Sequence, residues 1–213
     1  MRDEESGSWW QQVTGEAIFG PLKGQHLQPV IHDELTFGLW KTEKPQGRVL
    51  RPDEAVARAG KYAPADWEER MTKVRVTSSQ SLDSSIDPRM LVVGLTVNGA
   101  AIAYPFDALV KQSPIIDDVR GNPIVVVLGD DKKSVRAFER SVDGRKLELF
   151  VKQGVSPLRL ADAETGSEWD FTGKAIGGAL IGRQLKKIPV LNDYWFDWKT
   201  YHPDTMVYQL GNR

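Results

Sequence analysis

The sequence contains no cysteine and only three histidines among its 213 residues. The absence of cysteine excludes disulfide bonds, thiol catalysis and cysteine-ligated zinc within this sequence. With so few histidines a histidine-rich metal centre is not expected either, so the sequence predicts no metal and no cofactor.

A strong net charge and long apolar runs are also lacking. The 28 basic and 29 acidic residues leave a formal net charge of -1, which gives no general attraction to a phosphate backbone. The longest aliphatic runs, such as residues 124–128, are far shorter than the roughly 20 residues of a membrane span. Residues 1–7 are acidic, which is unlike a signal peptide. We therefore expect a globular chain with neither a nucleic-acid partner nor a membrane span.

The sequence does contain an internal repeat. Residues 3–50 (the first copy) align with residues 162–208 (the second copy) when one extra residue is allowed near Val13. The copies share Asp-x-Glu-x-Gly-Ser-x-Trp, Thr-Gly-x-Ala-Ile, Gly-x-Leu-x-Gly-x-x-Leu and Trp-Lys-Thr, in this order. About 18 of roughly 47 aligned positions are identical, against about two or three expected by chance, so the repeat is real.

The two copies differ in what precedes them. A β-patterned stretch, about residues 90–161, precedes the second copy and has no counterpart before the first. We predict that residues 1–50 are the C-terminal half of a first module, residues 51–85 a helical linker, and residues 86–213 a complete second module. Either the chain is truncated and Met1 is an internal methionine, or it is a natural protein of one and a half modules. Truncation is favoured, because half a β module leaves sheet edges unpaired.

Strand patterns dominate from Met90 onward. Apolar, β-branched runs alternate with turn signals, and strands recur about every eight to twelve residues. The clearest strands are 91–97, 100–104 and 123–128, with hairpin turns at Asn98-Gly99 and Asp143-Gly144 and short helices at 52–60, 64–71 and 105–111. This pattern predicts a mainly β fold, an antiparallel β sandwich or partly open barrel with short helices, built from the internal repeat.

Three residues near the end of the second copy are candidates for binding a small ligand. Trp198 offers an aromatic surface, and His202 and Asp204 follow it in a Tyr-His-Pro-Asp-Thr sequence. Trp169, Thr172 and Gly173 are added because Trp10 of the first copy likewise stands shortly before a Thr-Gly pair. For the tryptophans, repeated core anchors are the favoured alternative, and for His202 a turn histidine bonded to nearby backbone.

Two adjacent pairs of aspartates, Asp117-Asp118 and Asp130-Asp131, are candidates for acid–base chemistry or cation binding. Neighbouring residues of a strand point to opposite faces, and two lysines follow the second pair. Solvated positions are therefore the favoured interpretation of both pairs.

These motifs together resemble a bacterial protein family of unknown function, DUF3179, over nearly the whole chain. The residues that carry the resemblance are the shared repeat motifs, Trp198 with His202-Pro203-Asp204-Thr205, and the segment 97–105. The resemblance implies a Cys-Pro-Leu-Cys-like motif after the strand 124–128, sometimes with selenocysteine, and a histidine in the earlier helix that follows Tyr104-Pro105. Here those positions are Gly129, Lys132 and Gln112, so the second module is similar to a degenerate copy without redox or metal-binding groups.

Three functions follow, in order of preference. The first is a non-catalytic scaffold or interaction partner for a thiol or selenol redox module, or a metal module, that lies upstream of Met1. The second is a ligand-binding β module that uses Trp198, His202 and Asp204. The third is an enzyme that uses acid–base carboxylates. The expected partner is an upstream module of the same protein or a second copy of the chain. Relatives suggest export, which leaves the compartment open.

Overall fold

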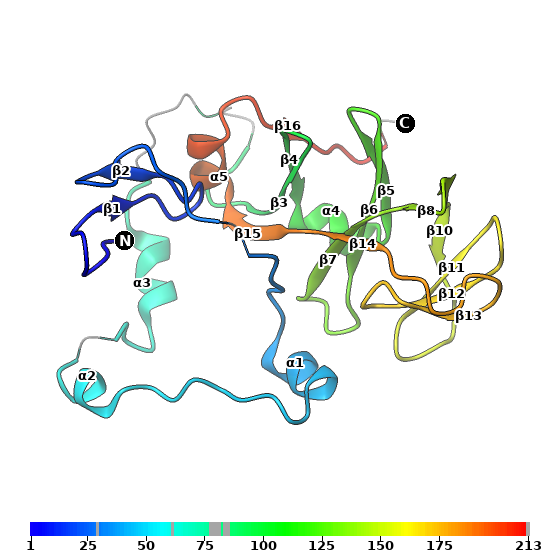
Figure 1. The fold of residues 1–213 in the computed structure, drawn as a ribbon, viewed down its shortest axis with the longest axis horizontal. Helices are drawn as coiled ribbons and strands as arrows, with labels where there is room; N and C mark the ends of the chain where they lie inside the picture. Colours follow the sequence, from blue (N-terminus) through cyan, green and yellow to red (C-terminus); the bar gives the residue numbers. More distant parts are fainter. Residues whose placement is uncertain (29, 61, 77–81, 83–85, 212–213) are drawn as a thin grey trace.

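The computed structural model describes residues 1–28, 30–60, 62–76, 82 and 86–211. The chain is mainly β, with 34% of residues in strands and 16% in helices. Most strands belong to three four-stranded sheets that lie side by side along the molecule (Figure 1). The predicted mainly β, antiparallel fold is confirmed, and no closed barrel is found in the described part of the chain.

The first two sheets enclose one apolar core. The first sheet has the order β15-β3-β4-β16 and is antiparallel except for the parallel pair of β16 and β4. Its strands are β3 (Leu91–Val97), β4 (Ala100–Pro105), β15 (Val190–Tyr194) and β16 (Met206–Val207). The second sheet, β14-β7-β6-β5, consists of β5 (Ile115–Val119), β6 (Asn122–Leu128), β7 (Val135–Glu139) and β14 (Lys186–Ile188).

The third sheet covers the other face of the second. Its order is β10-β11-β12-β13, and its strands are β10 (Leu149–Val151), β11 (Arg159–Asp162), β12 (Glu168–Asp170) and β13 (Ala175–Gly177). The side chains of β6 alternate between the two cores. Val126 packs toward the first sheet, whereas Val125 and Val127 pack toward the third. Because β6 is buried on both faces, its sequence is a continuous apolar run.

Two small hairpins and five short helices complete the fold. The hairpins are β1 (Trp9–Trp10) with β2 (Ala17–Phe19), and β8 (Ser141–Val142) with β9 (Arg145–Lys146). The helices are α1 (Phe37–Glu43), α2 (Glu54–Arg58), α3 (Trp67–Lys73), α4 (Phe106–Lys111) and α5 (Trp195–Tyr201). The predicted helices correspond to α2, α3 and α4, whereas α1 and α5 were not predicted. No helix within the described ranges is long and apolar enough to cross a membrane.

The predicted hairpin turns have the expected backbone. Asn98 and Gly99 have φ angles of 46° and 76°, and Asp143 and Gly144 have 50° and 76°. Positive φ at both central residues suits a two-residue turn between twisted strands. Within the predicted linker 51–85, residues 77–81 and 83–85 lie outside the described residues. The division of the chain into three parts stays a prediction.

The internal repeat is visible in the hydrogen bonds. In the first copy the Asp3 carboxylate accepts a hydrogen bond from Trp10 Nε1 at 2.8 Å, and in the second copy Asp162 accepts one from Trp169 Nε1 at 2.9 Å. The bond from Trp10, with further bonds from Ser6, holds the pKa of Asp3 well below its ordinary value. The shared Asp and Trp of the repeat therefore brace the same loop in both copies.

A shared glycine is required in each copy by close packing. A Cβ on Gly20 would lie 2.8 Å from the Cα of Ser8, and one on Gly178 would lie 2.5 Å from the Cα of Ser167. Both glycines have positive φ, and both serines accept a hydrogen bond at Oγ from a later leucine amide.

Candidate functional site

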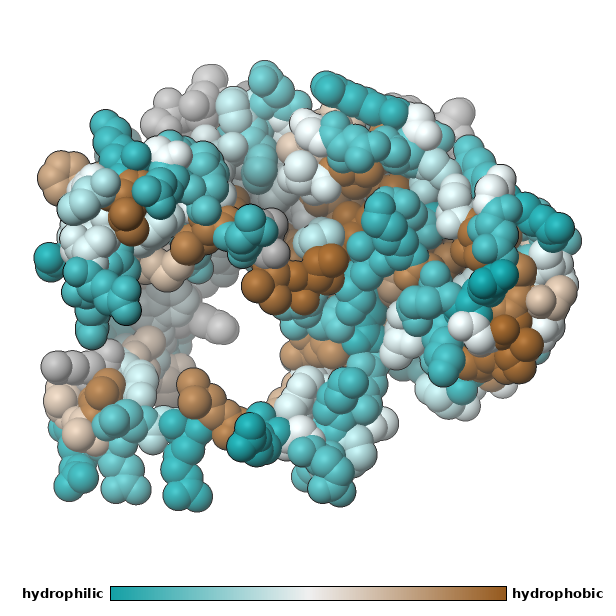
Figure 2. All heavy atoms as spheres, in the orientation of Figure 1, coloured by the Kyte–Doolittle hydropathy of each residue, from teal (hydrophilic) through white to brown (hydrophobic). Residues whose placement is uncertain are grey.

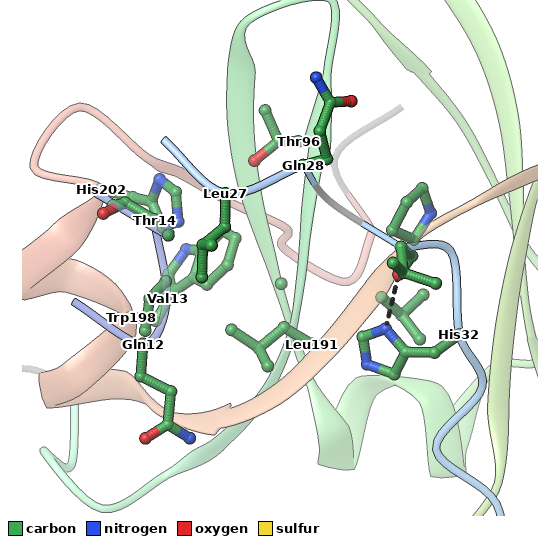
Figure 3. Close-up of a pocket in the computed structure, with 15 residues that line it drawn as sticks. Gln12, Val13, Thr14, Leu27, Gln28, His32, Thr96, Leu191, Trp198 and His202 are labelled. Atoms are coloured by element: carbon green, nitrogen blue, oxygen red, sulfur yellow. Dashed lines mark hydrogen bonds between the residues drawn. The ribbon is translucent and has the colours of Figure 1, made fainter. Parts of the chain in front are cut away.

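A cleft lies between the first copy and the first sheet. It has a volume of about 530 Å³ and is lined by the turn 12–15, by residues of β3, β15 and α5, and by four residues of the first copy, Leu27, Gln28, Val30 and His32. Figure 3 shows Val13 and Leu27 from the first copy beside Trp198, and Leu191 deeper in the same cleft. In the space-filling view, hydrophobic residues are exposed at the rim of an open gap above α1 and α2, next to this part of the molecule (Figure 2).

Trp198 and His202 form one wall of this cleft. Trp198 is buried, donates from Nε1 to Thr205 Oγ1 at 2.8 Å, and lies against Gly94 of β3. A Cβ at Gly94 would lie 2.3 Å from the indole, so only glycine leaves room for the ring. The ring centroids of Trp198 and His202 are 3.9 Å apart, and burial lowers the pKa of His202. This histidine is therefore neutral at pH 7.

The other predicted ligand-binding residues lie elsewhere. Asp204 is exposed and does not line the cleft. Trp169 is buried in the core between the second and third sheets, and Thr172 bonds Asp170 in the turn after β12. A Cβ on Gly173 would lie 2.6 Å from the Phe138 ring. Of the six candidates, the structure brings together only Trp198 and His202.

The two copies differ sharply in burial at matched positions. Leu185 of the second copy is 1% exposed, but its counterpart Leu27 is 45% exposed. Ile188 is 5% exposed, and its counterpart Val30 is 78% exposed. The second-copy segment forms β14 and β15, which pair with β7 and β3, whereas the described residues among 28–36 form no strand. In this segment the first copy therefore exposes apolar side chains and has no strand pairing, whereas the second copy forms part of two sheets.

Strand β7 fills this space in the second copy. The Phe138 ring covers Gly173, and the Arg136 guanidinium lies 4.7 Å from the centroid of the Phe171 ring. In the first copy, the three described atoms nearest to a Cβ on Gly15 all belong to Leu27, at 3.4 to 3.7 Å. A second hollow of about 310 Å³ continues from Leu27 to the first-copy loop, lined by Met1, Arg2, Asp3, Glu5, Ser6, Trp10, Leu22 and Leu27.

The first copy is attached to the second module by a clamp that sequence reasoning missed. Arg136 is 3% exposed in its side chain and binds Asp33 at 2.9 Å and Glu43 at 2.7 Å. Lys187 adds a second cation 2.7 Å from Asp33. Burial alone would raise the pKa of Asp33, but hydrogen bonds from Arg136 and Lys187 outweigh it and lower the pKa. The clamp fixes residues 33–43 across the edge of the second sheet.

Further polar contacts hold the same segment. Thr36, the N-cap of α1, donates from Oγ1 to Asp131 at 2.7 Å, and Asn192 donates to Glu34. Burial opposes ionisation of Asp131, but hydrogen bonds from Ser134 and Thr36 lower its pKa to about 2. Asp131 is therefore an ionised residue that holds the loop and α1 in place. It is one member of the candidate pair Asp130-Asp131.

The remaining candidate carboxylates are also separated from one another. Asp117 accepts a hydrogen bond from the Tyr104 hydroxyl, and Asp130 accepts one from the Leu158 amide. Asp118 lies at the surface, 3.5 Å from Lys146. No group of three or more His, Asp or Glu side chains that could hold a metal ion occurs within the described ranges. These contacts favour the solvated, structural interpretation of both acid pairs.

Asp193, in β15 two residues before α5, carries an unfavourable charge. Burial, together with the nearby charges of Asp197 and Glu34, raises its pKa to about 6. Because the pKa of Asp193 is higher in the folded chain than its ordinary value of 3.8, this group favours folding fully at a pH below 3.8. The contribution is lost as the pH rises through the folded value of about 6. We expect Asp193→Asn to raise the free energy of unfolding by about 1 kcal/mol at pH 7.5, since solvent screens a half-buried carboxylate, and by nothing near pH 4.

Thermal unfolding of the Asp193→Asn variant at the two pH values tests this expectation. Asp204→Asn, an exposed aspartate of the same region, is the control and should leave the melting temperature unchanged at both. A gain at pH 4 as large as that at pH 7.5 would show that charge is not its cause.

Comparison with known proteins gives a family. The sequence model of the family described as "Protein of unknown function (DUF3179)" matches residues 1–205. No curated protein and no solved structure matches the chain.

Proposed function

Since the chain belongs to the DUF3179 family, which carries no activity to transfer, we propose from its own structure that it is an interaction module. The cleft and the second hollow, which meet at Leu27, form one docking surface for a β-sheet partner. We call the side chains Leu22, Leu27, Val30 and Leu191, with Trp198, the docking surface. The chain then acts as a scaffold and not as a catalyst.

A single observation carries this proposal. The same backbone hydrogen bonds recur in both copies, but side chains that the second copy buries in a sheet are exposed in the first. Leu27 and Leu185 show this most directly, at 45% and 1% exposed. Exposed apolar groups that cluster in a concave region are typical of a protein interface. We expect the partner to resemble residues 91–161, with antiparallel strands that have one apolar face.

Ligand binding in the same cleft is a second candidate. A volume of about 530 Å³ suits a small molecule, and Trp198 and neutral His202 supply an aromatic wall. The cleft is lined on both sides by apolar residues, with Gln12, Thr14, Gln28 and Thr96 as uncharged polar groups. These features support an uncharged ligand. The exposed Asp204 would not contact it, because this residue does not line the cleft.

Cysteine labelling separates these candidates, since the chain has no other thiol. The variant Leu27→Cys places one thiol on the docking surface, and Ile181→Cys places a control thiol at a second-copy residue that is 66% exposed. We expect both purified variants to react rapidly with a maleimide. In native extracts of the producing cells, Leu27→Cys should react at least tenfold more slowly, and Ile181→Cys at an unchanged rate.

The size of the particle completes the test. Protection of Leu27→Cys in a particle larger than the chain supports docking. Protection in a particle the size of one chain supports a small ligand, and protection in a dimer of the chain alone supports self-association. Equal labelling in purified and native samples contradicts both docking and ligand binding.

A further inference from the structure

The two copies face each other in a reciprocal way. The turn of the second copy, at Phe171, faces Glu43 of α1 in the first copy, with Arg136 between them. The turn of the first copy, at Gln12, and Trp198 of α5 in the second copy both line the cleft. The cleft is therefore the counterpart of the space that Arg136 occupies.

Arg136 can be buried only because three groups receive it. Its guanidinium binds the Asp33 carboxylate through Nε at 3.2 Å and Nη2 at 2.9 Å. It binds Glu43 through both Nη atoms at 2.7 Å and lies over the Phe171 ring. Burial alone would lower the pKa of Arg136, but the bonds to Glu43 and Asp33 raise it. An arginine without such partners would be a buried, unpaired charge, which is strongly destabilising.

The repeat shows what receives the corresponding side chain in the cleft. The alignment matches Asp33 with Leu191, and Glu43 with Tyr201. It also matches Phe171 with Gln12. Both carboxylates that hold Arg136 are thus matched by uncharged residues, and the Phe171 ring is matched by an amide. Of the three counterparts, Gln12 and Leu191 line the cleft, and no carboxylate lines it in the described part of the chain.

We infer that the partner strand that takes the place of β7 on the docking surface has an apolar side chain at the position of Arg136. This inference rests on the proposed docking function and specifies the partner. The strand enters between Gln12 and Leu191, and its side chain packs on Leu191 and Leu27. The first-copy segment 27–32 runs directly into the clamped segment 33–43, so the new interface is continuous with the one that already joins the two copies. Because the existing interface joins the first copy to β strands, a β module is the expected partner on the adjoining docking surface.

Site-specific photocrosslinking in the producing cells identifies this strand. A benzoylphenylalanine in place of Val30, which lines the cleft and is 78% exposed, is compared with one in place of Val49, which is 65% exposed and outside it. We expect the Val30 probe alone to capture a peptide with strand alternation like residues 135–139 and an apolar residue at the position of Arg136. Capture of a β strand with arginine or lysine there overturns this inference but leaves docking intact. Capture of a non-β segment, of the chain itself, or of no peptide beyond the Val49 control overturns docking as well.

A charge test on the captured complex gives an independent result. The variant Leu191→Asp restores the carboxylate of the first copy, and Leu191→Asn is the uncharged control of equal shape. With an apolar partner side chain, we expect Leu191→Asp to weaken the complex at least tenfold more than Leu191→Asn does. Tighter binding of Leu191→Asp than of Leu191→Asn would show a cationic partner and overturn the inference. The melting temperature of each variant alone separates loss of binding from loss of folding.

Discussion

Replacing Arg136 with methionine is expected to lower the free energy of unfolding by about 3 kcal/mol, measured by denaturant titration at pH 7. The guanidinium is the centre of the clamp, and its loss leaves Glu43 without its cation and Asp33 with Lys187 alone. Those carboxylates are about one-fifth exposed in their side chains, so water compensates for only part of the loss. The exposed pair of Lys186 and Glu139 provides a control, because Lys186→Met should cost less than about 0.5 kcal/mol.

The repeat also supplies a compensating variant. The second copy has Leu191 and Tyr201 at the positions of Asp33 and Glu43. Combining Arg136→Met with Asp33→Leu and Glu43→Tyr replaces a buried ion cluster by apolar groups, an exchange that is often neutral or stabilising. We expect the triple variant to unfold within about 1 kcal/mol of the original chain. A triple variant less stable than Arg136→Met alone would show that the two copies are not interchangeable at this interface.

Much of the fold could be predicted because its signals are local. The alternation and β-branched content of 91–97, and the apolar run of 124–128, are set by which faces of a strand are buried. Asn98-Gly99 and Asp143-Gly144 specify their turns because both positions need positive φ. The repeat predicted that Trp10 and Trp169 occupy equivalent positions, and the structure places both on an aspartate of the same loop.

The site could be predicted only in part. Trp198 and His202 were candidates, but their common wall depends on Gly94, about one hundred residues earlier in the chain. The clamp joins Arg136 to Asp33 and Glu43, 103 and 93 residues away, and nothing in a local pattern marks such pairs. The three predicted helices each follow a proline that marks their start, at 52, 64 and 105, whereas no proline opens α1 or α5. The one available signal for the cleft was the repeat, which aligns Leu27 and Val30 with two apolar residues of the second copy, Leu185 and Ile188.

A matched pair of leucine substitutions measures how much of this surface lacks its partner. Leu185→Ala should lower the free energy of unfolding by about 3 kcal/mol, because a buried leucine loses its apolar contacts and leaves a cavity. Leu27→Ala removes the same atoms at the equivalent position of the first copy. It should cost less than about 1 kcal/mol, because nearly half of this side chain is already in water. Denaturant titration of the two variants in one buffer compares them directly.

The difference between the two costs is the contact energy that a partner would supply. Backbone conformation and loop hydrogen bonds are shared by the copies, so they largely cancel in the comparison. What remains is the covering strand, which Leu185 has and Leu27 does not. Equal costs near 3 kcal/mol would mean that the chain already buries Leu27 in solution, and the docking surface would then not exist. If the costs differ as expected, then Leu27→Ala should weaken the complex with the partner by about the amount by which it fails to destabilise the chain alone.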